Sequence, residues 1–185
     1  VMAEHSGNFV NSLTWSINDD GVLTISGAGE MPDYTNPTYT PWYSYRNSIK
    51  SVYIDAGVTS VGNYTFYDRY KGITSVSFSD DVTRIGDYAF YGCNMLTNLK
   101  LPDSVTTIGN YSFAYCSNII SVRLSKNIYN IENRAFKDCL SLIEIDIPDG
   151  AKSIGFESFD SCSSLTTVMI PESVTNIDGA AFNGC

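Results

Sequence analysis

The sequence predicts a β-rich solenoid of stacked repeats, closed at its N-terminal end by a small β cap. A Phe-x-x-Cys motif recurs at a fixed step of 23 residues, for example as "FYGC" at 90–93 and "FAYC" at 113–116. Short alternations of apolar residues recur in the same phase, and each is typical of a short β-strand. A unit of this length cannot bury its apolar face alone, so neighbouring units must stack into parallel coils with one common core.

The motif marks six repeats. Its phenylalanine column has six members: Phe66, Phe90, Phe113, Phe136, Phe159 and Phe182. Its cysteine column has five members: Cys93, Cys116, Cys139, Cys162 and Cys185. The first step of the phenylalanine column is 24 residues, because "YDRYKG" at 67–72 carries one extra residue and no cysteine.

The elements are expected in a fixed order along the chain. Residues 1–48 form the cap, in which apolar runs at 13–17 and 22–25 flank "NDDG", a β-hairpin signal, and Trp42 covers the open end of the first coil. Residues 49–185 form the repeat domain. Each repeat begins with its strand, and a proline ends three of these strands, at Pro102, Pro148 and Pro171.

The return path of each repeat is less regular. A second apolar pair, such as Val105 and Ile108, turns the chain inward again, and four of the six repeats place a glycine directly after it: Gly62, Gly86, Gly109 and Gly155. Glycine here is compatible with a turn of positive φ, although Glu132 and Asp178 occupy the same column. The Phe-x-x-Cys segment that follows is expected to form one turn of helix.

The cysteine column raises a choice between chemistry and packing. Zinc sites built on thiolates use cysteine pairs two to four residues apart or histidine partners, whereas these cysteines are singly spaced and the one histidine is His5. Equivalent residues of stacked coils lie about 5 Å apart, so buried Phe and Cys ladders are the favoured interpretation. Redox or metal chemistry is the alternative, and disulfides between neighbours would need converging Cβ directions.

Composition narrows the classes of function. A chain of 185 residues with 43% hydrophobic side chains can bury a core, and its net charge of −9 argues against nucleic acid and anionic membranes as partners. No apolar run is long enough to span a membrane. Nucleophile, metalloprotease and phosphate-loop motifs are absent from the sequence, and the acidic residues between repeats suit turns better than glycoside hydrolysis. No catalytic residue, metal or cofactor is therefore predicted.

The repeat consensus resembles a known family. The segment "LTNLKLPDSVTTIGNYSFAYC" (96–116) is similar to the BspA-like, Treponema pallidum-type leucine-rich repeat, and the resemblance covers residues 49–185. It implies a right-handed, curved solenoid with one parallel strand per repeat. It also implies a bacterial protein that is secreted or displayed on the cell surface and acts in adhesion. Host matrix proteins such as fibronectin and fibrinogen, or other bacteria, are the partners it implies.

The strand side chains that point outward form the concave face of a leucine-rich repeat, and they are the first candidate binding residues. One outward column places two cations beside acidic and apolar groups: Tyr53, Ser77, Lys100, Arg123, Asp146 and Met169. Outward Ile120 and Ile143 add apolar area that suits an interface. An ordinary mixed sheet surface is the alternative interpretation.

Tyrosines supply a second candidate. All 13 lie at or before residue 129, and Tyr64, Tyr88 and Tyr111 form a column two residues before the phenylalanine. Such rows suit glycan or protein recognition, with Tyr88 and Tyr111 as candidate ligands of a sugar, and they equally suit packing between coils.

The sequence therefore predicts a non-catalytic adhesion module that binds a protein partner. A carbohydrate-binding module or a structural spacer of a larger surface enzyme is the alternative. The chain stops at Cys185 within the sixth repeat, so we also expect further repeats or an anchor beyond it, and self-association through the uncapped last repeat.

Overall fold

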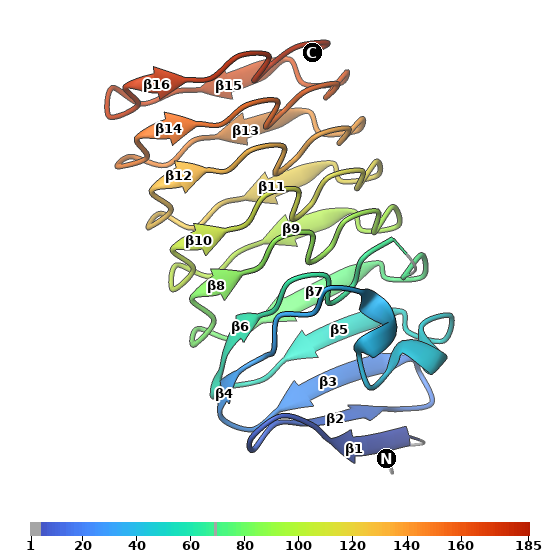
Figure 1. The fold of residues 1–185 in the computed structure, drawn as a ribbon. Helices are drawn as coiled ribbons and strands as arrows, with labels where there is room; N and C mark the ends of the chain where they lie inside the picture. The colour runs from blue at the N-terminus through green and yellow to red at the C-terminus, as the bar shows by residue number, and fades with distance from the viewer. Residues whose placement is uncertain (1–4, 69) are drawn as a thin grey trace.

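A computed structural model describes residues 5–68 and 70–185 and shows stacked coils that rise from a cap at the N-terminal end (Figure 1). Each coil contributes one strand to a front side and one to a back side, and the back strand is the shorter in every coil but the first. The front strands are β5 (Ser51–Ile54), β7 (Ser75–Phe78), β9 (Asn98–Lys100), β11 (Ser121–Arg123), β13 (Glu144–Asp146) and β15 (Thr167–Met169). The back strands are β6 (Val58–Val61), β8 (Arg84–Ile85), β10 (Thr107–Ile108), β12 (Asn130–Ile131), β14 (Ser153–Ile154) and β16 (Asn176–Ile177). The fold is the predicted leucine-rich-repeat solenoid.

The strands of neighbouring coils pair in parallel with the predicted phase. Leu99 lies opposite Val122, and Ile145 lies opposite Val168. Because the side-chain period of a strand is two, this register keeps the apolar positions on the core side of every coil. The front strands nevertheless form two separate sheets, one that ends at β7 and one that begins at β9.

The third side of each coil is a turn, and here the predicted turn of helix is wrong. The main-chain N–H groups of Tyr88, Phe90 and Gly92 donate to the carbonyl oxygens of Asn110, Ser112 and Ala114 in the next coil, at 2.8–2.9 Å. Equivalent bonds are present at all the remaining junctions between coils. A helical turn would direct these N–H groups along its own axis. They run along the solenoid instead and form a third ladder.

This third ladder depends on residues of positive φ. Two columns adopt the left-handed region, one two residues before each phenylalanine and one two residues after it. The first column is Tyr64, Tyr88, Tyr111, Arg134, Glu157 and Ala180. The second column is Asp68, Gly92, Tyr115, Asp138, Ser161 and Gly184. Ten of these twelve residues are not glycine, so inter-coil hydrogen bonding overrides the local preference against this conformation.

The glycines at 62, 86, 109 and 155 allow the backbones of adjacent coils to lie close together. The expectation that they provide a turn of positive φ is wrong. None of them has a positive φ. A Cβ on Gly109 would lie 2.5 Å from the main-chain nitrogen of Asp87 in the preceding coil, and one on Gly62 would lie 1.8 Å from the oxygen of Pro32. Glycine lets the backbones of adjacent coils approach at this point.

The core consists of the predicted ladders. Rings in the phenylalanine column stack with centroids 5.1–5.6 Å apart from Phe66 through Phe182. Four cysteines beside this column are buried, Cys185 is exposed, and all five are free thiols. The cysteine ladder therefore belongs to the packing of the core.

The cap continues the front sheet. Its strands are β1 (His5–Asn8), β2 (Thr14–Ile17), β3 (Val22–Ser26) and β4 (Gly29–Glu30), and its 3₁₀ helices are Pro37–Tyr39 and Tyr43–Tyr45. The hairpin predicted around "NDDG" is present as the antiparallel pair β2 and β3. β3 then pairs in parallel with β5, so cap and repeats share one core. The boundary between residues 48 and 49 stays a prediction.

Two aromatic residues join the cap to the first coil. The buried Trp42 lies over Phe66 with ring centroids 6.0 Å apart, as its predicted covering role requires. Tyr70, from the coil that lacks a cysteine, packs edge-on against Phe66 and shares a 2.7 Å hydrogen bond with the hydroxyl of Thr40. Burial raises the pKa of Tyr70 well above its usual value, so its hydroxyl stays protonated.

Candidate binding faces

The first candidate site is the front face, defined as the solvent-facing side chains of β5, β7, β9, β11, β13 and β15. The predicted column lies on it in register, with Tyr53 opposite Ser77, Lys100 opposite Arg123, and Asp146 opposite Met169. All six members of this column are exposed. The structure therefore brings the predicted residues to one surface, while their role in binding stays a prediction.

The charges of the front face are unevenly distributed. Arg123 donates to the carbonyl oxygen of Leu101 at 3.1 Å and pairs with Asp103 at 3.4 Å. Asp103 also accepts from the main-chain N–H of Lys126 and pairs with its ammonium group, so its pKa lies below the usual value. Within the described residues, Lys100 has neither an ion pair nor a side-chain hydrogen bond. Its ammonium group is free to meet a ligand.

Apolar side chains extend the front face toward the C-terminal coils. The exposed fractions are 47% for Ile120, 48% for Ile143 and 63% for Met169. Ile120 and Ile143 belong to equivalent positions of adjacent coils, joined by a main-chain hydrogen bond of 3.3 Å. Apolar groups next to unpaired charge are the composition expected of a protein interface.

The second candidate site is the tyrosine face, formed by Tyr64, Tyr67, Tyr88, Tyr91, Tyr111 and Tyr115 on the turn side. The ring of Tyr88 lies between those of Tyr64 and Tyr111, at 4.8 and 4.6 Å and nearly parallel to both. The guanidinium of Arg134 covers the other side of Tyr111 at 5.2 Å. Both rings therefore use both faces for packing and present only an edge and a hydroxyl to solvent. Stacking against a sugar needs an open ring face.

Beyond Tyr111 the same side of the solenoid becomes a charged network. Arg134 donates to Glu157 at 2.9 Å, and Lys137 pairs with both Glu157 and Asp160. Hydrogen bonds from Lys137 and Asn183 hold the pKa of Asp160 below its usual value. Aromatic stacking in the early coils and ion pairing in the later coils thus join consecutive turns.

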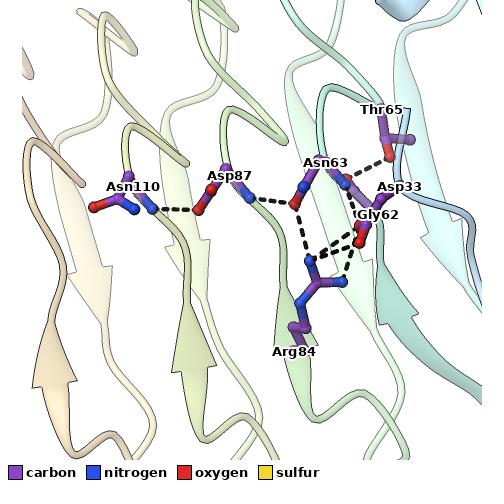
Figure 2. Close-up of polar contacts among 7 residues, drawn as sticks. All are labelled: Asp33, Gly62, Asn63, Thr65, Arg84, Asp87 and Asn110. Atoms are coloured by element: carbon purple, nitrogen blue, oxygen red, sulfur yellow. Dashed lines mark hydrogen bonds and ion pairs between the residues drawn. The ribbon is translucent and has the colours of Figure 1, made fainter. Parts of the chain in front are cut away.

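A third polar cluster lies where the cap meets the back of the first coils. Arg84 forms a two-pronged ion pair with Asp33, 51 residues away, and also donates to Asn63 at 2.9 Å (Figure 2). The oxygen of Asn63 accepts from the main-chain N–H of Asp87, whose own oxygen accepts from that of Asn110, both at 2.8 Å. This chain of side-chain oxygens links coils and satisfies main-chain donors. Every group in it has a partner, which favours a structural role.

The chain of oxygens is interrupted at one coil. Within the described chain, no hydrogen bond joins the N–H of Asn133 to the side chain of Asn110, whereas the next step resumes between Phe156 and Asn133 at 2.9 Å. The interruption coincides with Glu132, which replaces the glycine that precedes this position in four other coils. A Cβ prevents the close approach that the glycine column provides.

Other chemistry receives no support from the geometry. Among residues 5–68 and 70–185, no cluster of three metal-ligating side chains is present. Burial raises the pKa of Cys93, Cys116 and Cys139 far above the usual thiol value, and that of Cys162 to about 12. These thiols are poor nucleophiles at neutral pH. The described part of the chain also contains no helix long and apolar enough to cross a membrane.

Comparison with known proteins agrees with this geometry. Residues 59–185 match, as six copies, the sequence profile described as "BspA type Leucine rich repeat region". A search of curated proteins finds no match.

Solved structures show the same architecture. A leucine-rich cell surface protein from Faecalibacterium prausnitzii is 25% identical over 100% of this chain and 46% of its own, with a TM-score of 0.60. A leucine-rich repeat protein from Bacteroides ovatus is 20% identical over 92% of this chain and 55% of its own, with a TM-score of 0.59. The Treponema pallidum leucine-rich repeat protein is 19% identical over 84% of this chain and 88% of its own, with a TM-score of 0.54. The chain spans about half the length of the first two proteins.

Proposed function

This chain belongs to the BspA-type leucine-rich repeat family, and from that premise we propose that it is a non-catalytic adhesion module that binds proteins through its front face. The observation that carries the proposal is the exposed column from Tyr53 to Met169, one residue from each of six coils, in which Tyr53 lies opposite Ser77, Lys100 opposite Arg123, and Asp146 opposite Met169. Paired strands hold the backbone of this face in place before binding, so binding has to order only the side chains. The module is secreted or displayed on the surface of a bacterium.

The front face supports protein recognition better than glycan recognition. It combines free charge at Lys100 with exposed apolar groups at Ile143 and Met169, and such a combination suits a protein surface. The partner class follows the family resemblance: host matrix proteins such as fibronectin and fibrinogen, or surface proteins of other bacteria. The related Faecalibacterium prausnitzii protein is described as a cell surface protein, in line with this location.

The alternative function is a carbohydrate-binding module or a spacer of a larger surface enzyme. Its support is the tyrosine face, whose hydroxyl groups could donate to sugars. The covered faces of Tyr88 and Tyr111 weigh against it, because glycan sites use open aromatic faces. Glycan binding that is lost on Tyr88→Ala and Tyr111→Ala would favour this alternative.

Self-association through the last coil is a separate proposal. Ile170 and Ile177 are exposed there, at 43% and 48%. Analytical ultracentrifugation across a range of concentrations tests it. A shift of the sedimentation coefficient that Ile170→Lys/Ile177→Lys abolishes would support a dimer formed through this coil.

Biolayer interferometry of the monomeric chain tests the main proposal. The immobilised surfaces are fibronectin, fibrinogen and a panel of mucin glycans, each at two salt concentrations. We expect saturable binding to a protein surface that weakens at the higher salt, because exposed charges are screened. Binding only to glycans, or to no surface, would contradict adhesion to matrix proteins.

A further inference from the structure

A groove on the front face has features that the proposed function does not require. It opens at the junction between β7 and β9, where the front side divides into two sheets. On the back of the same coils, β8 and β10 remain paired, and the hydroxyl of Ser104 donates to the oxygen of Val82 at 2.7 Å. The coils therefore part on one side only.

A proline at the end of β9 removes one bond of this junction, but it does not by itself cause the opening, because Pro148 and Pro171 hold the same position after β13 and β15, which stay paired. One junction earlier, the N–H of Ser79 donates to the oxygen of Ile54 at 3.0 Å and fastens the end of β7 to β5. The residue at the position of Ser79 in the next coil is Pro102, which has no N–H to donate. The bond that would fasten the end of β9 to β7 cannot form. The edges of both strands are left unpaired with one another.

The floor of the groove is apolar. Val76 and Phe78 occupy columns whose members in the flanking coils are nearly inaccessible, with Val52 and Leu99 each at 2%. Both Val76 and Phe78 are instead only partly buried; β7 pairs with β5 on one side and has no paired strand on the side of β9. With Pro102, they line a volume of about 760 Å³. This size lies in the range of small-ligand sites and suits a few residues of a peptide.

One wall of the groove carries positive charge. Lys100 and Arg123 lie opposite one another in register and both line the groove. Asp103 already compensates Arg123 and Lys126, whereas Lys100 is uncompensated. Asp80, at another edge of the lining, is available to accept from an N–H group. In a chain of net charge −9, Lys100 is thus an uncompensated positive charge in the lining of the groove.

We propose that this groove binds an extended peptide segment of the partner protein, in which an apolar side chain covers Val76 and Phe78 and a neighbouring carboxylate pairs with Lys100. The inference rests on the proposed function and names the part of the partner that is recognised. Main-chain groups of β7 and β9 that have no partner at this junction can donate to and accept from such a segment. The apolar floor and the cation together set the sequence preference.

Titration of the ¹⁵N-labelled chain with blocked hexapeptides, followed by NMR, tests the proposal. Three peptides are compared: one with leucine beside glutamate, one with leucine beside glutamine, and one with serine beside glutamate. We expect the leucine and glutamate peptide to shift the amide signals of Val76, Phe78 and Lys100. We expect the other two to bind about tenfold more weakly, since each lacks one of the two contacts.

The variant Lys100→Gln supplies the charge-specific control. It should reduce the affinity for the leucine and glutamate peptide to that for the leucine and glutamine peptide, and leave the latter unchanged. Lys152→Gln removes the same charge from the back of the solenoid and should change neither affinity. Absence of shifts in the groove up to about 10 mM peptide, or equal affinities for Lys100→Gln and the unchanged chain, would overturn the proposal.

The peptide experiment tests the groove and the matrix-protein experiment tests adhesion, so a negative result in one does not imply a negative result in the other. A chain that binds fibronectin or fibrinogen through the front face, but shows no groove shifts with any peptide, leaves adhesion standing and overturns the groove. A chain that binds the leucine and glutamate peptide in the groove, but no matrix or glycan surface, supports the groove and contradicts adhesion to those partners.

Discussion

The thiol of Cys116 donates a hydrogen bond to the main-chain oxygen of Phe90 in the preceding coil, with sulfur and oxygen 3.2 Å apart. The same oxygen accepts from the N–H of Cys93 in its own coil at 3.1 Å. The cysteine thus satisfies the second lone pair of a buried carbonyl, while its sulfur fills the space beside the phenylalanine ladder. This relation recurs for all five cysteines, at 3.2–3.4 Å. It explains why cysteine suits this position better than alanine or valine.

Replacement of Cys116 by alanine should therefore destabilise the chain. The change removes a buried sulfur and one donor to the oxygen of Phe90, and we expect a loss of about 1–3 kcal/mol in the free energy of unfolding. Cys185→Ala, at an exposed cysteine, is the matched control and should cost less than about 0.5 kcal/mol. Urea unfolding measures both. Equal costs for the two variants would contradict the role assigned to the buried thiol.

The exposed Cys185 should react with thiol reagents faster than the four buried cysteines. The four buried thiols have raised pKa values because burial disfavours the thiolate, so the reactive form is scarce near pH 8. Burial also raises the pKa of Cys185, but its side chain is exposed, so we expect a colorimetric thiol reagent to modify Cys185 first and the other four only on unfolding. Five fast thiols in the native protein would refute the buried ladder.

Two substitutions of glycine by alanine should show whether glycine is needed for the contact between adjacent coils. One is at a glycine that closely contacts the adjacent coil and the other is at a glycine that does not. Gly109→Ala places a Cβ 2.5 Å from the nitrogen of Asp87, and we expect a loss of about 1–3 kcal/mol from the displaced coil. Gly179→Ala finds its nearest neighbour atom at 3.8 Å, in the ring of Phe156, and should be close to neutral. Thermal unfolding compares them. A neutral Gly109→Ala would show that the coils are not in tight contact there.

The pairing of Lys137 with Asp160 should make stability depend on pH in a defined window. The folded pKa of Asp160 lies below its unfolded value of about 3.9, so the carboxylate's contribution is complete above the unfolded pKa. It is lost as the pH falls through the folded pKa. We expect Lys137→Met to lower Tm at pH 7 and to have little effect at about pH 2.

A charge-matched substitution controls for the loss of a cation. Lys152→Met removes a lysine that has no side-chain partner in the described chain, and it should shift Tm little at either pH. A difference in Tm between Lys137→Met and the unchanged protein that is constant from pH 7 to about pH 2 would refute the ion-pair account.

Much of the fold could be predicted because the repeat makes one pattern visible six times. The strands, the Phe66-to-Phe182 stack and the buried cysteines all follow from an apolar period that a stacked coil must satisfy. The turn ladder could not be predicted, because residues as different as Tyr88, Arg134 and Ala180 share one positive φ. Hydrogen bonds to the next coil decide that conformation, and local propensity carries no sign of it.

The candidate sites follow the same division. The outward column from Tyr53 to Met169 could be predicted, because the period of a strand fixes which residues face solvent. The groove at Phe78 could not be predicted, because Pro102 occupies the same position as Pro148 and Pro171, which end strands that stay paired. The ion pair of Arg84 with Asp33 joins cap and repeats across 51 residues, and no repeat pattern relates these two positions.

Binding of charge-reversed variants tests the central claim most directly, namely that the front face is the binding surface for a protein. Lys100→Glu/Arg123→Glu is compared by biolayer interferometry with Lys71→Glu/Lys152→Glu, which makes the same change of charge away from the front face, against fibronectin and fibrinogen. We predict that the first variant loses at least about tenfold in affinity, while the second binds like the unchanged chain and both retain its circular dichroism spectrum. Equal affinities for the two variants, or binding to neither protein by the unchanged chain, would contradict the claim.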